Sequence, residues 1–221
     1  MKVLSKLLLV EGSDDWHVIK NLWKARTESE VPFEKSRSQE PDLDGSGKQR
    51  VLQDLPAQLK SETLHCLGIV LDADEQIGAT WDAVAKRLRE AGYDAPHKPA
   101  QDGLVLEHPD GYSPRVGVWL MPDNHVPGML EDFVRMLIPA DDDLAPEVDG
   151  VLDRIETKGI RRYVPRHRRK AFIHTWLAWQ EDPGKPMGLA ITIKYLNSDS
   201  PQADPFVAWL HRLFTEDARG N

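Results

Sequence analysis

The sequence predicts an α/β fold in which a mostly parallel sheet is flanked by helices. Short apolar runs at residues 6–10 and 67–71 each end at an acidic turn, which is typical of buried strands. Each run is followed by apolar residues at helical spacing, and strands that alternate with helices usually form a parallel sheet. We therefore expect an α/β domain over residues 1–138 and a mainly helical C-terminal extension, packed on it, over residues 139–221.

The helix after the first strand is indicated by apolar residues three or four positions apart. Ser13 or Asp14 is placed to cap its N-terminus. We expect Pro56 to kink or split a second helix, and the acidic stretch 141–149 to be a solvated loop or a weak helix start. The other elements expected are strands at 31–34, 103–107 and 115–121, helices at 51–59, 81–88 and 129–137, and a loop at 36–47.

Composition and charge narrow the class of protein. The net charge of -8 argues against a uniformly basic surface that coats nucleic acid, but it is compatible with carboxylates that bind divalent cations. Cys66 is the only cysteine, which excludes an internal disulfide and favours the cytoplasm. No apolar stretch approaches the ~20 residues of a membrane span. We expect a soluble, cytoplasmic protein that does not insert into a membrane.

Acidic residues follow two of the predicted strands. Glu11 comes after the first strand, and Asp72 and Asp74 come after the strand at 67–71. The carboxyl ends of parallel strands meet at one edge of a sheet, so these carboxylates converge if the two strands are neighbours. Hard divalent cations prefer oxygen ligands. The sequence therefore predicts a Mg²⁺ or Mn²⁺ site, although Asp and Glu at such positions are also common helix caps and turn residues.

The segments LLLVEGSDD and LGIVLDADE resemble the two motifs of the Toprim domain, which topoisomerases, primases and related nucleases share. That family has a Glu after its first strand and a D-x-D after a later one. Here these positions are Glu11 and Asp72-Ala73-Asp74, and Gly12 also matches the Gly that follows the Glu. The resemblance covers residues 5–135 and implies a Toprim-like fold with a metal site for phosphodiester chemistry.

The finer pattern resembles the nuclease branch typified by the overcoming-lysogenisation-defect proteins. In that branch a second acidic residue four positions after the Glu also serves the metal, and Asp15 has this spacing. The segment MPDNHVPGMLEDF is similar to small stand-alone bacterial Toprim-like proteins without an established function, and it places Glu131 and Asp132 after another strand. The resemblance thus adds Asp15 and Glu131 to the implied metal ligands.

A late lysine is also implied by the resemblance to these nucleases. Lys185 and Lys194 are both candidates, and either is commonly a plain surface residue. We include Lys194 with Glu11, Asp72 and Asp74 in the predicted catalytic set. Lys48 ends the segment DGSGK, but this segment lacks the first Gly and the final Ser or Thr of a phosphate-binding loop.

A basic run lies in the predicted extension. It either contacts a nucleic-acid backbone or forms a solvated helix face that balances the acidic loop before it. The arginines predicted to bind nucleic acid are Arg161, Arg162, Arg166, Arg168 and Arg169. Nearby aromatic positions, which we expect to pack onto the sheet rather than to stack on bases, are His174, Trp176, Trp179, Trp209 and Phe214.

Three hypotheses about function follow. The first is a Mg²⁺- or Mn²⁺-dependent nuclease that acts on DNA or RNA. The second is a Toprim-like module without catalytic activity that binds a protein or nucleic-acid partner through the basic region. The third is a flavodoxin-like or receiver-like domain with an acidic pocket, which the Glu11-Gly12 pair suits poorly.

Overall fold

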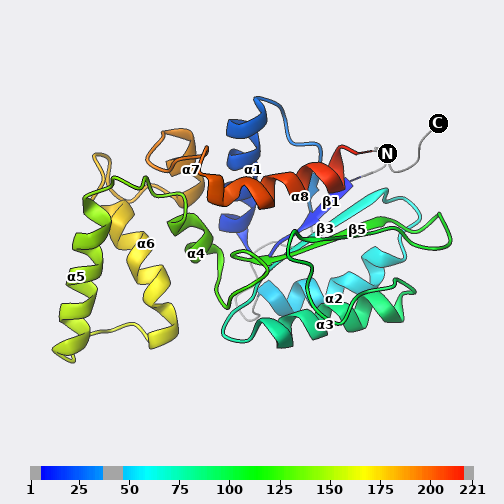
Figure 1. The fold of residues 1–221 in the computed structure, drawn as a ribbon, viewed down its shortest axis with the longest axis horizontal. Coiled ribbons are helices and arrows are strands. Elements are labelled where there is room, and N and C mark those ends of the chain that lie inside the picture. The colour runs from blue at the N-terminus through cyan, green and yellow to red at the C-terminus, as the bar shows by residue number, and fades with distance from the viewer. Residues whose placement is uncertain (1–5, 37–46, 217–221) are drawn as a thin grey trace.

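The fold is a three-layer α/β arrangement built on a five-stranded sheet, as the computed structural model of the chain shows for residues 6–36 and 47–216 (Figure 1). The strand order is β2-β1-β3-β5-β4, and all neighbours are parallel except β4 and β5. The predicted α/β fold with a mostly parallel sheet is therefore confirmed. The strands are β1 (Lys6–Leu9), β2 (Glu34–Lys35), β3 (Cys66–Asp72), β4 (Leu104–Leu106) and β5 (Arg115–Met121).

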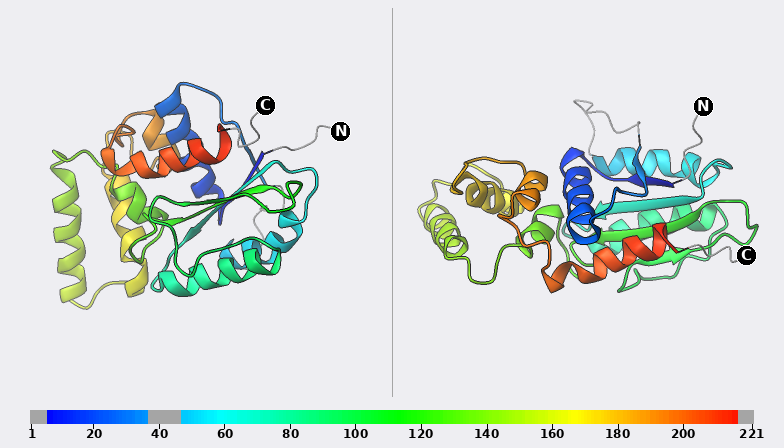
Figure 2. Two further views of the ribbon diagram at one scale, coloured as in Figure 1. Left: turned by 45° about the vertical axis from the view of Figure 1, so that its right-hand side comes forward. Right: turned by 90° about the horizontal axis from the view of Figure 1, so that it is seen from above.

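Helices cover both faces of the sheet. Helices α1 (Ser13–Thr27) and α8 (Asp204–Phe214) lie on one face, while α2 (Gly47–Leu59) and α3 (Ile77–Glu90) lie on the other (Figures 1 and 2). Successive side chains of a strand point to opposite faces. In β3, accordingly, Leu67, Ile69 and Leu71 pack in the core with α2 and α3, whereas Val70 packs in the core with α1 and α8.

The remaining helices belong mostly to the C-terminal extension. They are α4 (Leu130–Arg135), α5 (Leu144–Thr157), α6 (Arg168–Ala178) and α7 (Met187–Thr192). Helices α5 and α6 pack against each other beside the sheet, and α7 packs on α1, where Asn21 donates a hydrogen bond to the Gly188 carbonyl at 2.8 Å (Figure 2). One hydrophobic core includes residues from both the α/β domain and the extension, so the extension is packed on the sheet layers.

Helix α2 runs through Pro56 without a break, so the expected split does not occur. A proline inside a helix leaves the carbonyl four residues earlier without its helical donor. Here that carbonyl belongs to Leu52, and it accepts a hydrogen bond of 2.6 Å from Arg87 Nε of α3. A tertiary contact thus satisfies the group that the proline leaves unpaired.

Other boundaries differ from the expectations by a few residues. The N-cap of α1 is Gly12, without a side-chain cap from Ser13 or Asp14. The stretch at 141–149 contains the start of α5, which is a full helix. The short second strand lies at the end of the predicted range, as β2. Of the predicted loop at 36–47, residues 37–46 lie outside the described residues.

None of the helices in the described ranges combines the length and the apolar character that crossing a membrane requires.

Two paired glycines allow α8 to pack closely on the sheet. Gly68 of β3 and Gly117 of β5 are register partners. A Cβ atom at Gly117 would lie 2.5 Å from Leu213 Cδ2, and one at Gly68 would lie 2.8 Å from Phe214 Cζ. The side chains at the end of α8 therefore occupy the space that larger residues would fill.

We predict that Gly117→Val lowers the free energy of unfolding by about 2 kcal/mol, because the added atoms overpack the contact with Leu213. The matched control is Gly78→Ala in α3, where a Cβ meets nothing within 4 Å. This control should be at least as stable as the unchanged chain, since Ala has the higher helix propensity. Urea unfolding followed by circular dichroism measures both, and equal stability of the two variants would contradict the packing argument.

Candidate functional site

A cleft of about 740 Å³ lies at the carboxyl ends of β1 and β3. Its lining includes Glu11, Asp72 and Asp74, the three carboxylates that the sequence places after these strands. They meet because β1 and β3 are parallel neighbours in register, with Leu9 opposite Ile69. The convergence predicted from the sequence is therefore present in the structure.

Backbone hydrogen bonds hold two of these carboxylates in place. Glu11 Oε1 accepts a bond of 2.8 Å from the Asp72 backbone N–H. Asp72 Oδ1 accepts one of 2.8 Å from the backbone N–H of Leu130, at the start of α4. Asp74 has a left-handed backbone with φ of 54°, and its N–H donates to the Gly128 carbonyl at 2.7 Å. Hydrogen bonds to Glu11 on one side and to the segment 128–130 on the other therefore hold the turn after β3 in place.

Lys48 of α2 lies in the cleft, although the sequence predicts no role for it there. Its ammonium group donates to the Asp72 carbonyl at 2.7 Å and to Thr80 Oγ1 at 3.0 Å, and it forms an ion pair with the Asp74 carboxylate. A Cβ atom at Gly47 would lie 2.0 Å from the Glu11 carbonyl oxygen, so a glycine there lets α2 begin against the end of β1. The sequence feature that could have identified Lys48 is the pair Gly47-Lys48. Gly47 allows the close approach to Glu11, and Lys48 pairs with the Asp74 carboxylate.

Asp15 and Glu131, the two predicted extensions of the metal site, are buried beside the cleft, with 7% and 6% of their surfaces exposed. Burial raises the pKa of Asp15 to about 7, and the negative charges of Glu11 and Glu131 add to this effect. Burial likewise raises the pKa of Asp72 to about 9, with contributions from Glu11 and Asp15. Four of the five predicted carboxylates therefore interact electrostatically: Glu11, Asp15, Asp72 and Glu131.

Glu11 is also affected by its surroundings. Burial raises its pKa, while the hydrogen bond from Asp72 and the positive charge of Lys48 act in the opposite direction. Such crowded carboxylates repel one another when ionised, and a divalent cation relieves that repulsion, so this donor set fits Mg²⁺ or Mn²⁺ in chemistry. In the side-chain positions present, no three His, Cys, Asp or Glu residues of the described ranges surround a common point closely enough to hold an ion.

The basic run divides between two surfaces. Arg166 and Arg169 line the cleft, together with His167 and Lys170. Arg169 Nε pairs with Asp132 Oδ2 at 2.8 Å, which ties α6 to α4. Part of the predicted nucleic-acid surface thus faces the carboxylates.

The other arginines of the run do not line the cleft. Arg168 pairs with Asp149, Asp153 and Glu156 of α5, so it joins the two helices. Arg161 and Arg162 are exposed on the segment between α5 and α6. Arg168 therefore fits the alternative interpretation of the basic run, in which its charges balance nearby acidic residues.

Neither late lysine lines the cleft. Lys194 is exposed just after α7 and has a left-handed backbone with φ of 64°. Lys185 pairs with Asp182 at 2.6 Å. Among the described residues that line the cleft, the lysines are Lys48 and Lys170.

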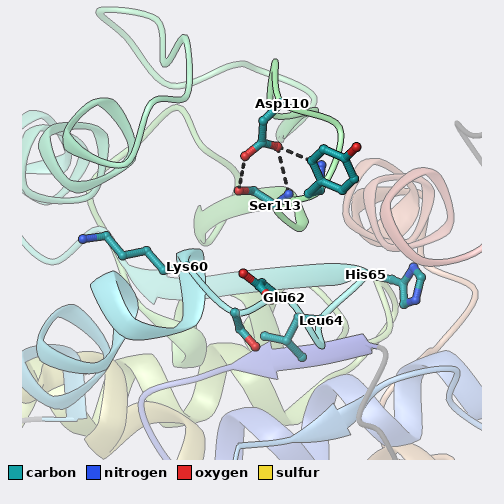
Figure 3. Close-up of a pocket in the computed structure, with 8 residues that line it drawn as sticks. Lys60, Glu62, Leu64, His65, Asp110 and Ser113 are labelled. Carbon is teal, nitrogen blue, oxygen red and sulfur yellow. Dashed lines mark hydrogen bonds between the residues drawn. The ribbon is translucent and has the colours of Figure 1, made fainter.

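A second pocket of about 610 Å³ lies at the opposite end of β3 (Figure 3). Its carboxylate Asp110 accepts hydrogen bonds from the backbone N–H groups of Tyr112 and Ser113, at 2.8 and 2.9 Å, and from the Ser113 hydroxyl. These bonds lower the pKa of Asp110 and stabilise the turn at residues 110–113. We therefore assign this carboxylate a structural role.

Because burial raises the pKa of Asp15, we predict that the free energy of unfolding depends on pH. This pKa is about 7 in the folded chain and near 3.8 in the unfolded chain, so folding takes up a proton between these pH values. The stability contribution of Asp15 therefore falls as the pH rises through this window. We expect Asp15→Asn to be more stable than the unchanged chain at about pH 8, by on the order of 2 kcal/mol in EDTA, and this gain to disappear near pH 4.

Urea unfolding at several pH values measures this difference. The matched control is Asp14→Asn, which changes the exposed neighbouring carboxylate and should leave stability nearly unchanged. A gain for Asp15→Asn that is the same at low and high pH would contradict the burial argument.

Comparison with known proteins assigns a family. No curated protein and no solved structure matches the chain. A family model described as "Protein of unknown function (DUF3226)" matches residues 5–215, a range that includes every residue of the cleft described above. The chain therefore belongs to the DUF3226 family.

Proposed function

We propose that the cleft binds nucleic acid and cleaves its phosphodiester bonds with the help of Mg²⁺ or Mn²⁺. The observation that carries this proposal is the composition of the cleft, whose lining combines strand-end carboxylates with basic residues at the start of α6. The carboxylates suit a divalent cation, and the basic residues suit a phosphate backbone. The resemblance of the segments around Glu11 and Asp72 to Toprim motifs supports the same chemistry.

The proposed role of the carboxylates is to bind the divalent ion. Glu11, Asp72 and Asp74 would hold the ion, with Asp15 and Glu131 close behind them. A bound divalent ion supplies positive charge that stabilises the phosphate as negative charge develops on it. For Asp74 this role requires its side chain to turn from the Lys48 ammonium toward Glu11 and Asp72.

The other residues of the cleft would position the substrate and the water. Arg166, in the 3-10 turn just before α6, and Arg169 and Lys170 of α6 would pair with phosphate oxygens, because all three line the cleft. Glu11, just after β1, would serve either as a ligand of the ion or as the general base that accepts a proton from the attacking water. Lys48 keeps the turn after β3 in position through the Asp72 carbonyl.

A second candidate function is a nucleic-acid-binding module without catalytic activity. It is favoured by the hydrogen bonds that Glu11 and Asp72 accept from backbone N–H groups, since such bonds also suit carboxylates with a structural role. Both candidates use the basic face of α6. They differ in whether the carboxylates bind metal.

We predict that the double variant Asp72→Asn/Asp74→Asn loses metal-dependent cleavage by at least about a hundredfold, because it removes two of the three proposed ligands. The measurement is product release from labelled single-stranded and duplex DNA and from RNA, with Mg²⁺ or Mn²⁺. Calorimetric titration with Mn²⁺ should show binding to the unchanged chain and much weaker binding to the variant.

The matched control is Asp94→Asn, an exposed carboxylate after α3 that does not line the cleft. It should cleave as the unchanged chain does. Cleavage by the double variant at the unchanged rate would refute the active-site assignment, and absence of Mn²⁺ binding to the unchanged chain would favour the module without catalysis.

The divided basic run generates a separate prediction about binding. We expect Arg166→Ala to weaken nucleic-acid binding and to reduce the slope of log affinity against log salt by about one, because one phosphate contact is lost. Arg168→Ala should leave that slope unchanged and lower stability instead, by about 1 kcal/mol, because Arg168 joins α6 to α5.

Fluorescence anisotropy at several salt concentrations, together with urea unfolding, measures both effects. Equal salt slopes for the two variants would show that Arg166 does not contact the nucleic acid and that the cleft is not the binding surface.

A further inference from the structure

A shallow groove of about 490 Å³ runs along α6 and leads away from the cleft. His167 and Lys170 line both this groove and the cleft, so the two depressions adjoin at these residues. Tyr163 lines the groove near the start of α6, and Trp179 lines it at the end. A long ligand bound in the cleft would therefore meet the groove at His167 and Lys170.

The groove follows one face of the helix. Lys170, His174 and Ala178 are four positions apart, which places them on the same side of α6, and His167 is the N-cap residue of that helix. From His167 to Ala178 this face extends for ~16 Å, at 1.5 Å per residue. The groove is thus long enough for several nucleotides rather than a single small molecule.

The chemistry of this face suits a polyanion with flat rings. None of the described residues that line the groove is acidic, although the chain has a net charge of -8. Lys170 and the neighbouring Arg166, an exposed side chain, supply positive charge at the end near the cleft. Trp179 supplies an aromatic surface at the far end.

Trp179 is the most exposed tryptophan of the chain. The sequence predicts that both Trp176 and Trp179 pack onto the rest of the protein. Trp176 is 1% exposed and does so, whereas Trp179 is 44% exposed. An exposed indole at the end of a basic groove is the arrangement on which unpaired bases stack.

We propose that this groove holds a single-stranded segment of nucleic acid, whose bases stack on Trp179 and whose backbone passes Lys170 into the cleft. The proposal rests on the proposed function, because it specifies the substrate of the same site. A duplex keeps its bases stacked inside, so it presents only its backbone to the groove and gains nothing from Trp179. Single-stranded DNA and RNA share the chemistry that the groove recognises.

The test measures binding in EDTA, so that it does not depend on cleavage. The probes are fluorescein-labelled strands of about 15 nucleotides, as single-stranded DNA, single-stranded RNA and duplex DNA. We expect Trp179→Ala to weaken binding of the single strands by about tenfold and binding of the duplex by less than about twofold. Trp179→Phe, which keeps an aromatic face, should retain most of the affinity for the single strands.

The matched control is Tyr112→Ala. Tyr112 is 80% exposed and lines the pocket at the opposite end of β3, so it tests for a general effect of losing a surface aromatic side chain. Its affinity for all three probes should equal that of the unchanged chain. Unchanged single-strand binding by Trp179→Ala, preference for the duplex, or no binding of any probe would overturn the proposal.

The outcome for the groove is separable from the outcome for the active site. If Trp179→Ala binds as the unchanged chain does while Asp72→Asn/Asp74→Asn abolishes cleavage, the groove assignment is wrong and the active site stands. If no metal-dependent cleavage occurs but Trp179→Ala loses single-strand binding, the groove stands and the cleavage proposal is wrong.

Discussion

The parallel pairing of β1 with β3 is the constraint on which the site depends. This register places Glu11 beside Asp72, and the hydrogen bond from the Asp72 N–H to Glu11 joins the two strand ends. A shift by one residue would turn alternate side chains to the other face and would exchange the two apolar cores. The same pairing that builds the sheet therefore also gathers the carboxylates.

Gathering carboxylates at a partly buried sheet edge has an energetic cost. The raised pKa values of Asp15 and Asp72 reflect burial first and mutual repulsion second. Lys48 offsets part of this cost by placing a positive charge next to Asp74 and Glu11. Sites of this kind, in which stability is sacrificed locally, are more frequent at functional positions than elsewhere.

Helix α6 contributes residues both to the proposed active-site cleft and to the proposed groove for single-stranded nucleic acid. One side of the helix carries Arg168, which pairs with acidic residues of α5 and orients the helix. The side facing the cleft carries Arg169 and Lys170, and Lys170 pairs with Glu131 at 3.5 Å. Because the helix is anchored on both sides, its basic residues face the carboxylates and its groove continues from the cleft.

The sequence by itself determined the fold class and the three strand-end carboxylates, because short apolar runs followed by acidic turns depend only on local pattern. Tertiary structure decided which cations face them: Lys48 reaches the site from α2, while Lys194 lies beyond α7 and outside the cleft. It also decided that Trp179 is exposed and Trp176 is buried. Spacing along a helix specifies which residues share a side, but only packing against the rest of the chain determines which side faces the cleft, the core or solvent.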